Sequence, residues 1–233
     1  MDRQRCLIVN ADDFGQSPGV NRGVIDAHER GIVTSASLMV RWPAAPEAAE
    51  YARQHPELSV GLHFEVGEWA FREGEWTAVY EVVRSEDRSA VELELERQLE
   101  GFQRLVGRPP THLDSHQHVH LRGTVRPAAE RLARDLEIPL RCCSPFIQYN
   151  GTFYGQTDDG LQVPGAISVT ALIGTLEALP WGWTELACHP GRGNDLDTMY
   201  GLEREREVAV LCDSTVRDAL SRLRINLRSF REI

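Results

Sequence analysis

The sequence has few features of disulfide-bonded, zinc-thiolate or nucleic-acid-binding proteins. Its five cysteines are odd in number and include no Cys-x-x-Cys pair, so neither a disulfide framework nor a thiolate zinc site is indicated. No run of basic residues is present, and 35 acidic against 25 basic side chains give a formal net charge of −10. Nucleic acids and anionic membranes are therefore poor partners, because both require clustered lysine and arginine.

Long apolar runs are also missing. Too few apolar residues precede Asn10 to form a signal-peptide core, and no run approaches the length of a membrane span. The sequence therefore predicts a cytoplasmic protein without a membrane span. No repeat or linker divides the 233 residues, of which 42% are hydrophobic, so we expect one domain over residues 1–233.

Segments with strand and helix character alternate along the chain. The first expected strand lies within residues 7–15, and the others cover residues 34–40, 58–64, 111–115, 138–142, 184–188 and 224–230. The expected helices cover residues 20–30, 44–54, 89–106, 124–136, 167–179 and 203–222. Residues 65–88 read as a long loop with a short hairpin, and residues 144–164 as a loop. This alternation predicts an α/β fold with a parallel sheet, either open or closed into a barrel.

Two adjacent carboxylates, Asp12 and Asp13, follow the first apolar run where turn residues begin. Neighbouring strand residues point in opposite directions, so one acid can bind a cation while the other transfers a proton. Aspartate near a helix start also commonly acts as a cap, and the pair alone does not distinguish these explanations.

Half of the eight histidines fall within nine residues, at His112, His116, His118 and His120. With Asp114 they occupy even positions and would share one face of an extended strand. The run would then span roughly 26 Å, so at most two of the histidines can bind one ion. We expect structural hydrogen bonds for His112 and His120.

His63 and His189 each end an expected strand. In a parallel sheet they would meet Asp12, Asp13 and His116 at one edge, as active-site residues do in barrel enzymes. One carboxylate and two imidazoles can hold a divalent ion and leave positions open for water and substrate. Imidazole ligands favour Zn²⁺, whereas Mg²⁺ prefers more oxygen ligands. Such an ion activates water and polarises a carbonyl oxygen, so amide or ester hydrolysis is the leading chemistry.

Five motifs, in this order, resemble the YdjC-like carbohydrate deacetylases. They are residues 10–15 (Asn-Ala-Asp-Asp-Phe-Gly) with Ser17 and Asn21, then residues 31–35, 61–64, 110–120 and 188–191. That family includes chito-oligosaccharide deacetylases and relatives linked to hopanoid biosynthesis. The resemblance implies a distorted (β/α) barrel akin to the NodB-type polysaccharide deacetylases. It also implies removal of the acetyl group from an N-acetylated amino sugar with a divalent metal, usually Mg²⁺.

The resemblance further implies roles for individual residues. The family's metal ligands correspond to Asp13, His63 and His116. Its general base corresponds to Asp12, and its acid, which protonates the leaving amine, to His189.

Other side chains are expected around this centre. We expect His118 to lie outside the ligand set and Asp114 to orient a ligating imidazole. Four aromatic residues are candidates for stacking on a pyranose ring, although each can equally be a packing residue: Trp42, Trp69, Phe153 and Tyr154.

The sequence leaves other functions open. A metal-dependent phosphoesterase or cyclic amidohydrolase can use a similar barrel, but a phosphate substrate requires cations near the mouth, and the motif segments offer little beyond Arg41, Arg122 and Arg192. A sugar-binding or partner-binding protein without turnover is a further alternative, although a pure binder has little use for an unligated base beside a metal.

Two regions show the limits of the resemblance. The stretch after His63 is shorter than in many relatives, and no motif matches beyond Gly191. The resemblance therefore does not specify the sugar or its chain length. The charged helix expected at residues 203–222 is either a solvated face or the surface of a homodimer, with the solvated face favoured.

Overall fold

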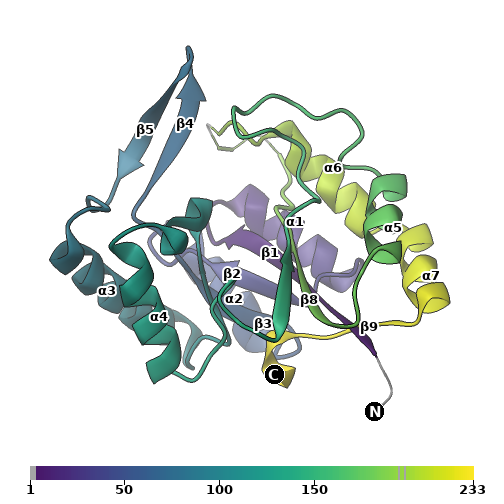
Figure 1. Cartoon of the computed structure of the whole chain (residues 1–233), viewed down its shortest axis with the longest axis horizontal. Helices are drawn as coiled ribbons and strands as arrows, with labels where there is room; N and C mark the ends of the chain where they lie inside the picture. The colour runs from purple at the N-terminus through teal and green to yellow at the C-terminus, as the bar shows by residue number, and fades with distance from the viewer. Residues whose placement is uncertain (1–3, 194, 197) are drawn as a thin grey trace.

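The computed structural model describes residues 4–193, 195–196 and 198–233. Its centre is a curled sheet in the order β6-β3-β2-β1-β8-β7, with β9 pairing beside the start of β1 (Figure 1). All of these pairings are parallel, which confirms the predicted α/β fold in the form of a half-barrel. The strands are β1 Arg5–Phe14, β2 Ser35–Leu38, β3 Ser59–Phe64, β6 Leu113–Ser115, β7 Ile147–Asn150, β8 Gly182–Cys188 and β9 Ile225–Leu227.

Helices follow the strands and pack along the sheet (Figure 1). They are α1 Pro18–Glu29, α2 Ala45–Gln54, α3 Arg88–Val106, α4 Val125–Asp135, α5 Val169–Glu177, α6 Leu202–Leu211 and α7 Ser214–Leu223, with 3₁₀ segments η1 His116–Leu121 and η2 Phe230–Glu232. Local capping explains several helix boundaries. The Ser17 hydroxyl accepts from the N–H of Val20 at the start of α1, and Gly107 ends α3 in the left-handed conformation at φ 78.

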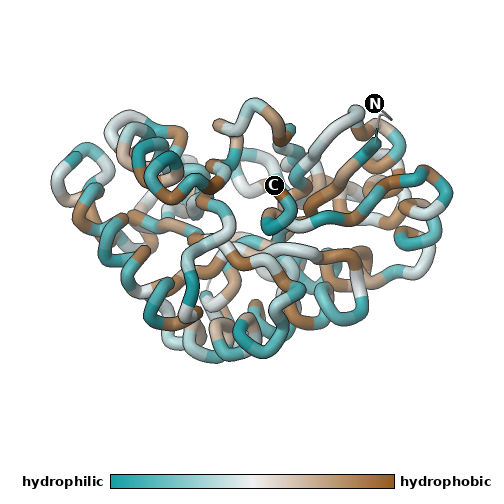
Figure 2. Tube along the Cα trace, turned by 90° about the horizontal axis from the view of Figure 1, so that it is seen from below, coloured by the Kyte–Doolittle hydropathy of each residue, from teal (hydrophilic) through white to brown (hydrophobic). Residues whose placement is uncertain are grey.

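Side chains of β1 alternate between an apolar face and a polar face. Leu7 and Val9 belong to the main hydrophobic core. Asn10 and Asp12, on the other face, bond to each other through the Asn10 amide at 2.8 Å. Figure 2 shows hydrophobic stretches along the strands and hydrophilic stretches on outward-facing turns of the helices. Toward the carboxyl ends of the strands, the inner face of the curled sheet therefore carries polar residues.

A small second core closes the inner face at the amino-terminal end of the strands. It consists of Ile8, Ile147 and Phe230, with Trp183 packed against it. Phe230 comes from the last segment of the chain and stacks on the ring of His112 at 3.8 Å between centroids. The inner face is thus apolar at this end and polar toward the carboxyl ends of the strands.

An antiparallel hairpin of β4 Gly67–Arg72 and β5 Glu75–Glu81 projects from the body (Figure 1). Phe71 pairs with Trp76 and Trp69 with Ala78, which puts the three large aromatic side chains on one face of the hairpin. The predicted hairpin is confirmed, and it is longer than the short one that we expected.

Three predicted segments were wrong. Residues 138–142 make only one isolated bridge, from Leu140 to Leu113, because Cys142 turns the chain with φ 60. Strand β7 lies in the segment predicted to be a loop, and its four residues are too few for a clear alternation. The predicted helix at 203–222 is two helices, because the Asp213 side chain accepts from the N–H of Thr215 and starts α7. None of the helices formed by the described residues is long and apolar enough to cross a membrane.

Candidate active site

The three predicted metal ligands, Asp13, His63 and His116, lie together at the carboxyl edge of the sheet. Nδ1 of His116 lies 3.1 Å from Oδ1 of Asp13, and Nε2 of His63 lies 3.3 Å from the same oxygen. One ligand atom from each residue lies within 4.8 Å of the others. A carboxylate and two imidazoles facing one another in this way fit a divalent ion.

Asp114 orients His63. Its Oδ1 lies 2.8 Å from Nδ1 of His63, which leaves Nε2 of that ring toward Asp13. The Ser37 hydroxyl donates to the other oxygen of Asp114 at 2.6 Å. In a metal-binding histidine, the ring nitrogen that does not bind the metal commonly bonds a carboxylate. The expected contact of Asp114 with an imidazole is therefore present.

Nearby carboxylates stabilise the protonated forms of the His63 and His116 imidazoles. Burial alone would lower the pKa of His63, but Asp114 and Asp13 raise it to about 10. Burial also acts to lower the pKa of His116, but Asp13 and Glu68 raise it to about 9. A metal ion that binds here at neutral pH must therefore displace protons.

Asp12 is buried and held by Arg141. The guanidinium donates to Oδ2 of Asp12 at 2.6 Å and to Oδ1 at 2.7 Å. Burial acts to raise the pKa of Asp12, but Arg141 lowers it below its usual value. Asp12 is therefore a carboxylate at neutral pH, the state that a general base requires.

Arg141 also contacts Asp114 and Glu185, each at 2.7 Å. Asp12, Asp114 and His63 form a second group whose ligand atoms lie close enough together to hold a metal ion. Arg141 bonds both of its carboxylates, and the positive charge of this guanidinium would repel a cation placed there, so this second group does not suit a metal ion.

His189 lies beside Asp12, with its Nε2 3.7 Å from Oδ2. Its backbone N–H donates to Glu207, and its ring packs edge-on against Tyr154 and Tyr200. Burial lowers the pKa of His189 to about 4. The imidazole is thus neutral at pH 7, and it must take up a proton before it can protonate a leaving group.

The histidine run does not continue as an extended strand beyond Ser115, where the predicted strand also ended. β6 ends at Ser115, and Gln117 and His118 have φ values of 50 and 52 within η1. This left-handed backbone turns the chain away from the strand direction, so the histidines no longer share one face.

The outer histidines of the run make structural hydrogen bonds, as predicted. Nε2 of His112 bonds the Ser37 hydroxyl at 3.0 Å, and Nε2 of His120 bonds the carbonyl of Arg141 at 3.1 Å. His118 lies outside the ligand group and bonds the Tyr149 hydroxyl at 3.1 Å.

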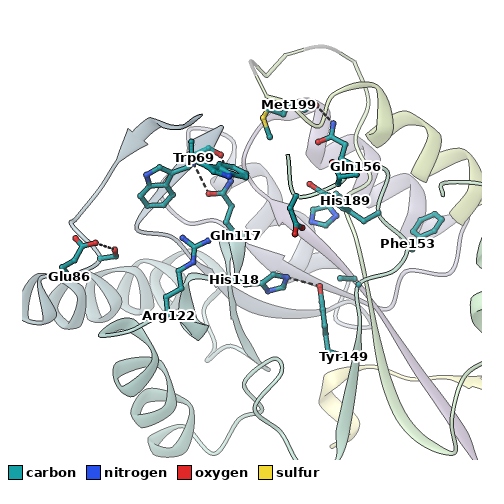
Figure 3. Close-up of a pocket in the computed structure, with 17 residues that line it drawn as sticks. Trp69, Glu86, Gln117, His118, Arg122, Tyr149, Phe153, Gln156, His189 and Met199 are labelled. Atoms are coloured by element: carbon teal, nitrogen blue, oxygen red, sulfur yellow. Dashed lines mark hydrogen bonds between the residues drawn. The ribbon is translucent and has the colours of Figure 1, made fainter. Parts of the chain in front are cut away.

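A cavity of about 790 Å³ adjoins this centre, with His189 and His118 in its lining (Figure 3). Pockets for small molecules commonly measure about 300–1,000 Å³. Apart from the two histidines, its lining includes Trp69, Trp76, Glu86, Gln117, Arg122, Tyr149, Phe153, Tyr154, Gln156 and Met199.

Three of the four aromatic candidates line this cavity: Trp69, Phe153 and Tyr154. Trp42 is not among its lining residues and packs edge-on against Tyr80, 5.5 Å between centroids. Phe153 is mostly a core residue, with 2% of its surface exposed. Trp42 therefore lies outside the lining of this cavity, and its contact with substrate stays a prediction.

The three arginines considered for phosphate binding lie in different places. Arg41 pairs with Glu94 at 3.3 Å and Arg192 with Asp26 at 2.8 Å. Only Arg122 of the three lines the cavity.

Two residues of the site were not predicted from the sequence. Arg141 bonds Asp12, and Arg204 bonds Asp13. A weak signal existed for Arg141, since a charged residue follows the apolar stretch 138–140. No signal marked Arg204, because residues 203–206 read Glu-Arg-Glu-Arg and look like a solvated helix face.

The sequence matches a known protein family over most of its length. The model of the YdjC-like protein family matches residues 6–222. The chain belongs to the YdjC-like family. The carbohydrate deacetylase of Geobacillus stearothermophilus is 37% identical to it, over 98% of this chain and 98% of its own. The chitooligosaccharide deacetylase of Yersinia pestis (strain Pestoides F) is 32% identical, over 97% of this chain and 98% of its own.

Solved structures share the fold of this YdjC-like chain. A provisionally assigned cellobiose-phosphate cleavage protein from Enterococcus faecalis V583 has a TM-score of 0.77 at 26% identity, covering 98% of both chains. The family 4 carbohydrate esterase from Streptomyces lividans, solved with acetate, has a TM-score of 0.60 at 10% identity, covering 97% of this chain and 93% of its own. These similarities confirm the predicted distorted-barrel fold.

Proposed function

We propose that this YdjC-like chain is a metal-dependent carbohydrate deacetylase that removes the acetyl group from an N-acetylated amino sugar. Chito-oligosaccharides are the leading substrate class, because relatives at 32–37% identity are named carbohydrate and chitooligosaccharide deacetylases. The observation that carries the proposal is a metal-binding group next to a second carboxylate, Asp12, that is not part of it.

In this proposal Asp13, His63 and His116 hold the ion through Oδ1, Nε2 and Nδ1. The two imidazoles suit Zn²⁺, and the family resemblance favours Mg²⁺. A divalent ion held by these residues would supply Lewis-acid chemistry for hydrolysis of the acetyl amide.

Asp12 and His189 handle the protons. Asp12 accepts a proton from the water that attacks the acetyl carbon. Its Oδ2 lies 3.7 Å from Nε2 of His189, so the proton passes to that imidazole through one water molecule or after a small approach of the two side chains. His189 then donates it to the sugar nitrogen as the carbon–nitrogen bond breaks. The products are acetate and a free amine.

The cavity lined by Trp69 and Tyr154 receives the sugar in this proposal. Aromatic rings can cover the apolar face of a pyranose while the surrounding polar groups bond its hydroxyls. His118 lies on the same wall and is held by Tyr149, so it contacts the sugar rather than the ion.

Acetate release from N,N′-diacetylchitobiose tests the proposal. The metal-loaded protein is expected to release acetate, whereas the metal-free protein and the Asp12→Asn variant are not. Full turnover by a folded Asp12→Asn variant would refute the role of Asp12. Hydrolysis of a phosphodiester without acetate release would favour a phosphoesterase, and sugar binding without release would favour a silent binding protein.

A further inference from the structure

A buried arginine from α6 reaches the candidate metal ligands. Arg204 is 6% exposed, and its Nη2 donates to Oδ2 of Asp13 at 2.7 Å. The other oxygen, Oδ1, lies 3.3 Å from Nε2 of His63 and 3.1 Å from Nδ1 of His116. The two oxygens of Asp13 are therefore divided between one guanidinium and the two imidazoles.

Regular strand geometry does not determine the direction of the Asp13 carboxylate. Asp13 has φ 64, in the left-handed region, so it departs from the regular alternation of β1. A partner on Oδ2 is then needed to define which oxygen faces the histidines. Arg204 is the described residue that bonds this atom.

Two glycines allow close packing around Arg204 and the neighbouring loop at residues 190–193. A Cβ on Gly191 would lie 2.9 Å from Cδ of Arg204. A Cβ on Gly23 of α1 would lie 2.3 Å from Cα of Gly191. Gly191 also donates its N–H to the carbonyl of Arg204 at 3.2 Å. Close packing of α1, the loop at 190–193 and α6 therefore sets the position of Arg204.

Helix α6 also bonds the backbone of His189, the proposed proton donor. Nη1 of Arg204 donates to the carbonyl of His189 at 3.4 Å. Glu207, nearly one turn further along α6, accepts from the N–H of His189 and from the Tyr200 hydroxyl. α6 thus bonds one oxygen of Asp13 and both backbone polar groups of His189.

We propose that Arg204 is a positioning residue of the metal site. By holding Oδ2 of Asp13 it presents Oδ1 alone to the ion, and by bonding the carbonyl of His189 it sets the place of that imidazole relative to the ion. This inference rests on the metal-binding part of the proposed function and not on deacetylation.

A simpler role would be that of a counter-charge for buried Asp13. The two roles predict opposite effects on metal affinity. A guanidinium repels a nearby divalent cation, so removing a mere counter-charge would tighten metal binding. Removing a positioning residue weakens it, because loss of a partner that orients a ligand typically lowers metal affinity about 10–100-fold.

Metal titration of Arg204→Met by isothermal calorimetry, with Mg²⁺ and with Zn²⁺, distinguishes these roles. We expect the dissociation constant to rise about tenfold or more. The matched control is Arg206→Met, since Arg206 is exposed on the same helix, and its affinity is expected to equal that of the wild type. Unchanged or tighter binding by a folded Arg204→Met variant would overturn the proposal.

Arg204→Lys keeps the test decisive if Arg204→Met does not fold. The lysine retains the positive charge but lacks the planar fork that contacts two acceptors at once. The counter-charge role predicts wild-type affinity for this variant, and the positioning role predicts weaker binding. Because the titration needs no substrate, a protein that binds metal normally but releases no acetate would refute the deacetylase proposal and leave this inference standing.

Discussion

Asp12 and Asp13 are adjacent in the sequence, yet each carboxylate is held by a different buried arginine. Both oxygens of Asp12 accept from Arg141, while Asp13 bonds Arg204 through Oδ2 and keeps Oδ1 for the histidines. A carboxylate whose two oxygens are both occupied is poorly placed to bind an ion. The contacts therefore support separate roles for the two acids.

Removing either histidine ligand should abolish tight metal binding. His63→Ala and His116→Ala each delete one of three candidate donor atoms, so we expect a loss of affinity beyond the about 10–100-fold that a missing outer partner causes. Calorimetric titration measures it, with His55→Ala as the control, because His55 follows α2 and does not belong to the group. Stoichiometric binding by both ligand variants would refute the ligand assignment.

Metal binding should strengthen as the pH rises from 7 to 9. The pKa values of His63 and His116 are raised to about 10 and about 9, so both rings carry protons that the ion must displace. Each displaced proton changes the dissociation constant by about tenfold per pH unit. Calorimetry in two buffers with different ionisation enthalpies counts the released protons, and a count of zero at pH 7 would contradict the prediction.

The same pKa shifts affect the stability of the metal-free protein. Because the folded pKa values lie above the unfolded value of about 6.5, the two protonated rings stabilise the fold fully below pH 6.5. This contribution is lost as the pH rises through about 9 and about 10. Metal and protons thus act as alternative stabilising cations at one site.

At the scale of elements, the β4–β5 hairpin extends the cavity with aromatic side chains. Trp76 lines the cavity while 50% exposed, and Phe71 supports its ring edge-on at 5.7 Å between centroids. The hairpin is attached to η1, where the Gln117 side chain bonds both backbone polar groups of Trp69. This arrangement suits contact with a sugar ring beyond the one that reacts.

Trp76→Ala should raise the KM for N,N′-diacetylchitobiose about two- to tenfold, which corresponds to about 0.5–1.5 kcal/mol for a lost ring contact. The KM for N-acetylglucosamine should change little. Trp181→Ala is the matched control, because Trp181 is 54% exposed and packs under Arg5 before β8, away from the cavity. Equal changes for both sugars would contradict this role of the hairpin.

The strands that lead to Asp13, His63 and His189 were predictable because each contains a clear apolar run. β1, β3 and β8 match their predicted positions, and the ligands follow from the meeting of parallel strands at one edge. The course of the chain after Ser115 was not predictable. The left-handed φ at Gln117 and His118 is uncommon for residues other than glycine, so local sequence does not predict it and tertiary contacts stabilise it.

At the scale of the whole molecule, the last segment of the chain completes the inner face of the sheet. β9 pairs with β1, and Phe230 is 4% exposed against Ile8, Ile147 and the ring of His112. This plug lies at the opposite end of the strands from the candidate metal ligands. The plug reaches the candidate site through His112, whose Nε2 bonds the Ser37 hydroxyl beside Asp114. We therefore expect loss of the plug to reduce stability more than metal affinity.

Phe230→Ala should lower the free energy of unfolding by about 3–5 kcal/mol, as expected for a buried ring replaced by a cavity. Urea denaturation measures the change, and metal affinity of the folded variant should stay at the wild-type value. Leu227→Ala is the control, with a smaller expected loss because Leu227 is 37% exposed. If Phe230→Ala lowered the free energy of unfolding no more than Leu227→Ala, the role of Phe230 as a plug would be contradicted. A single unfolding transition is expected for one domain.

The sequence by itself determined the parallel α/β fold and the meeting of Asp13, His63 and His116. Strand periodicity and the order of motifs are local properties, and the parallel arrangement brings strand ends to one edge. Only the tertiary structure decided which arginine holds which acid. Arg141 and Arg204 lie 129 and 191 residues from their partners Asp12 and Asp13. The packing of elements that are distant in the sequence determines such pairs, so local sequence patterns do not predict them.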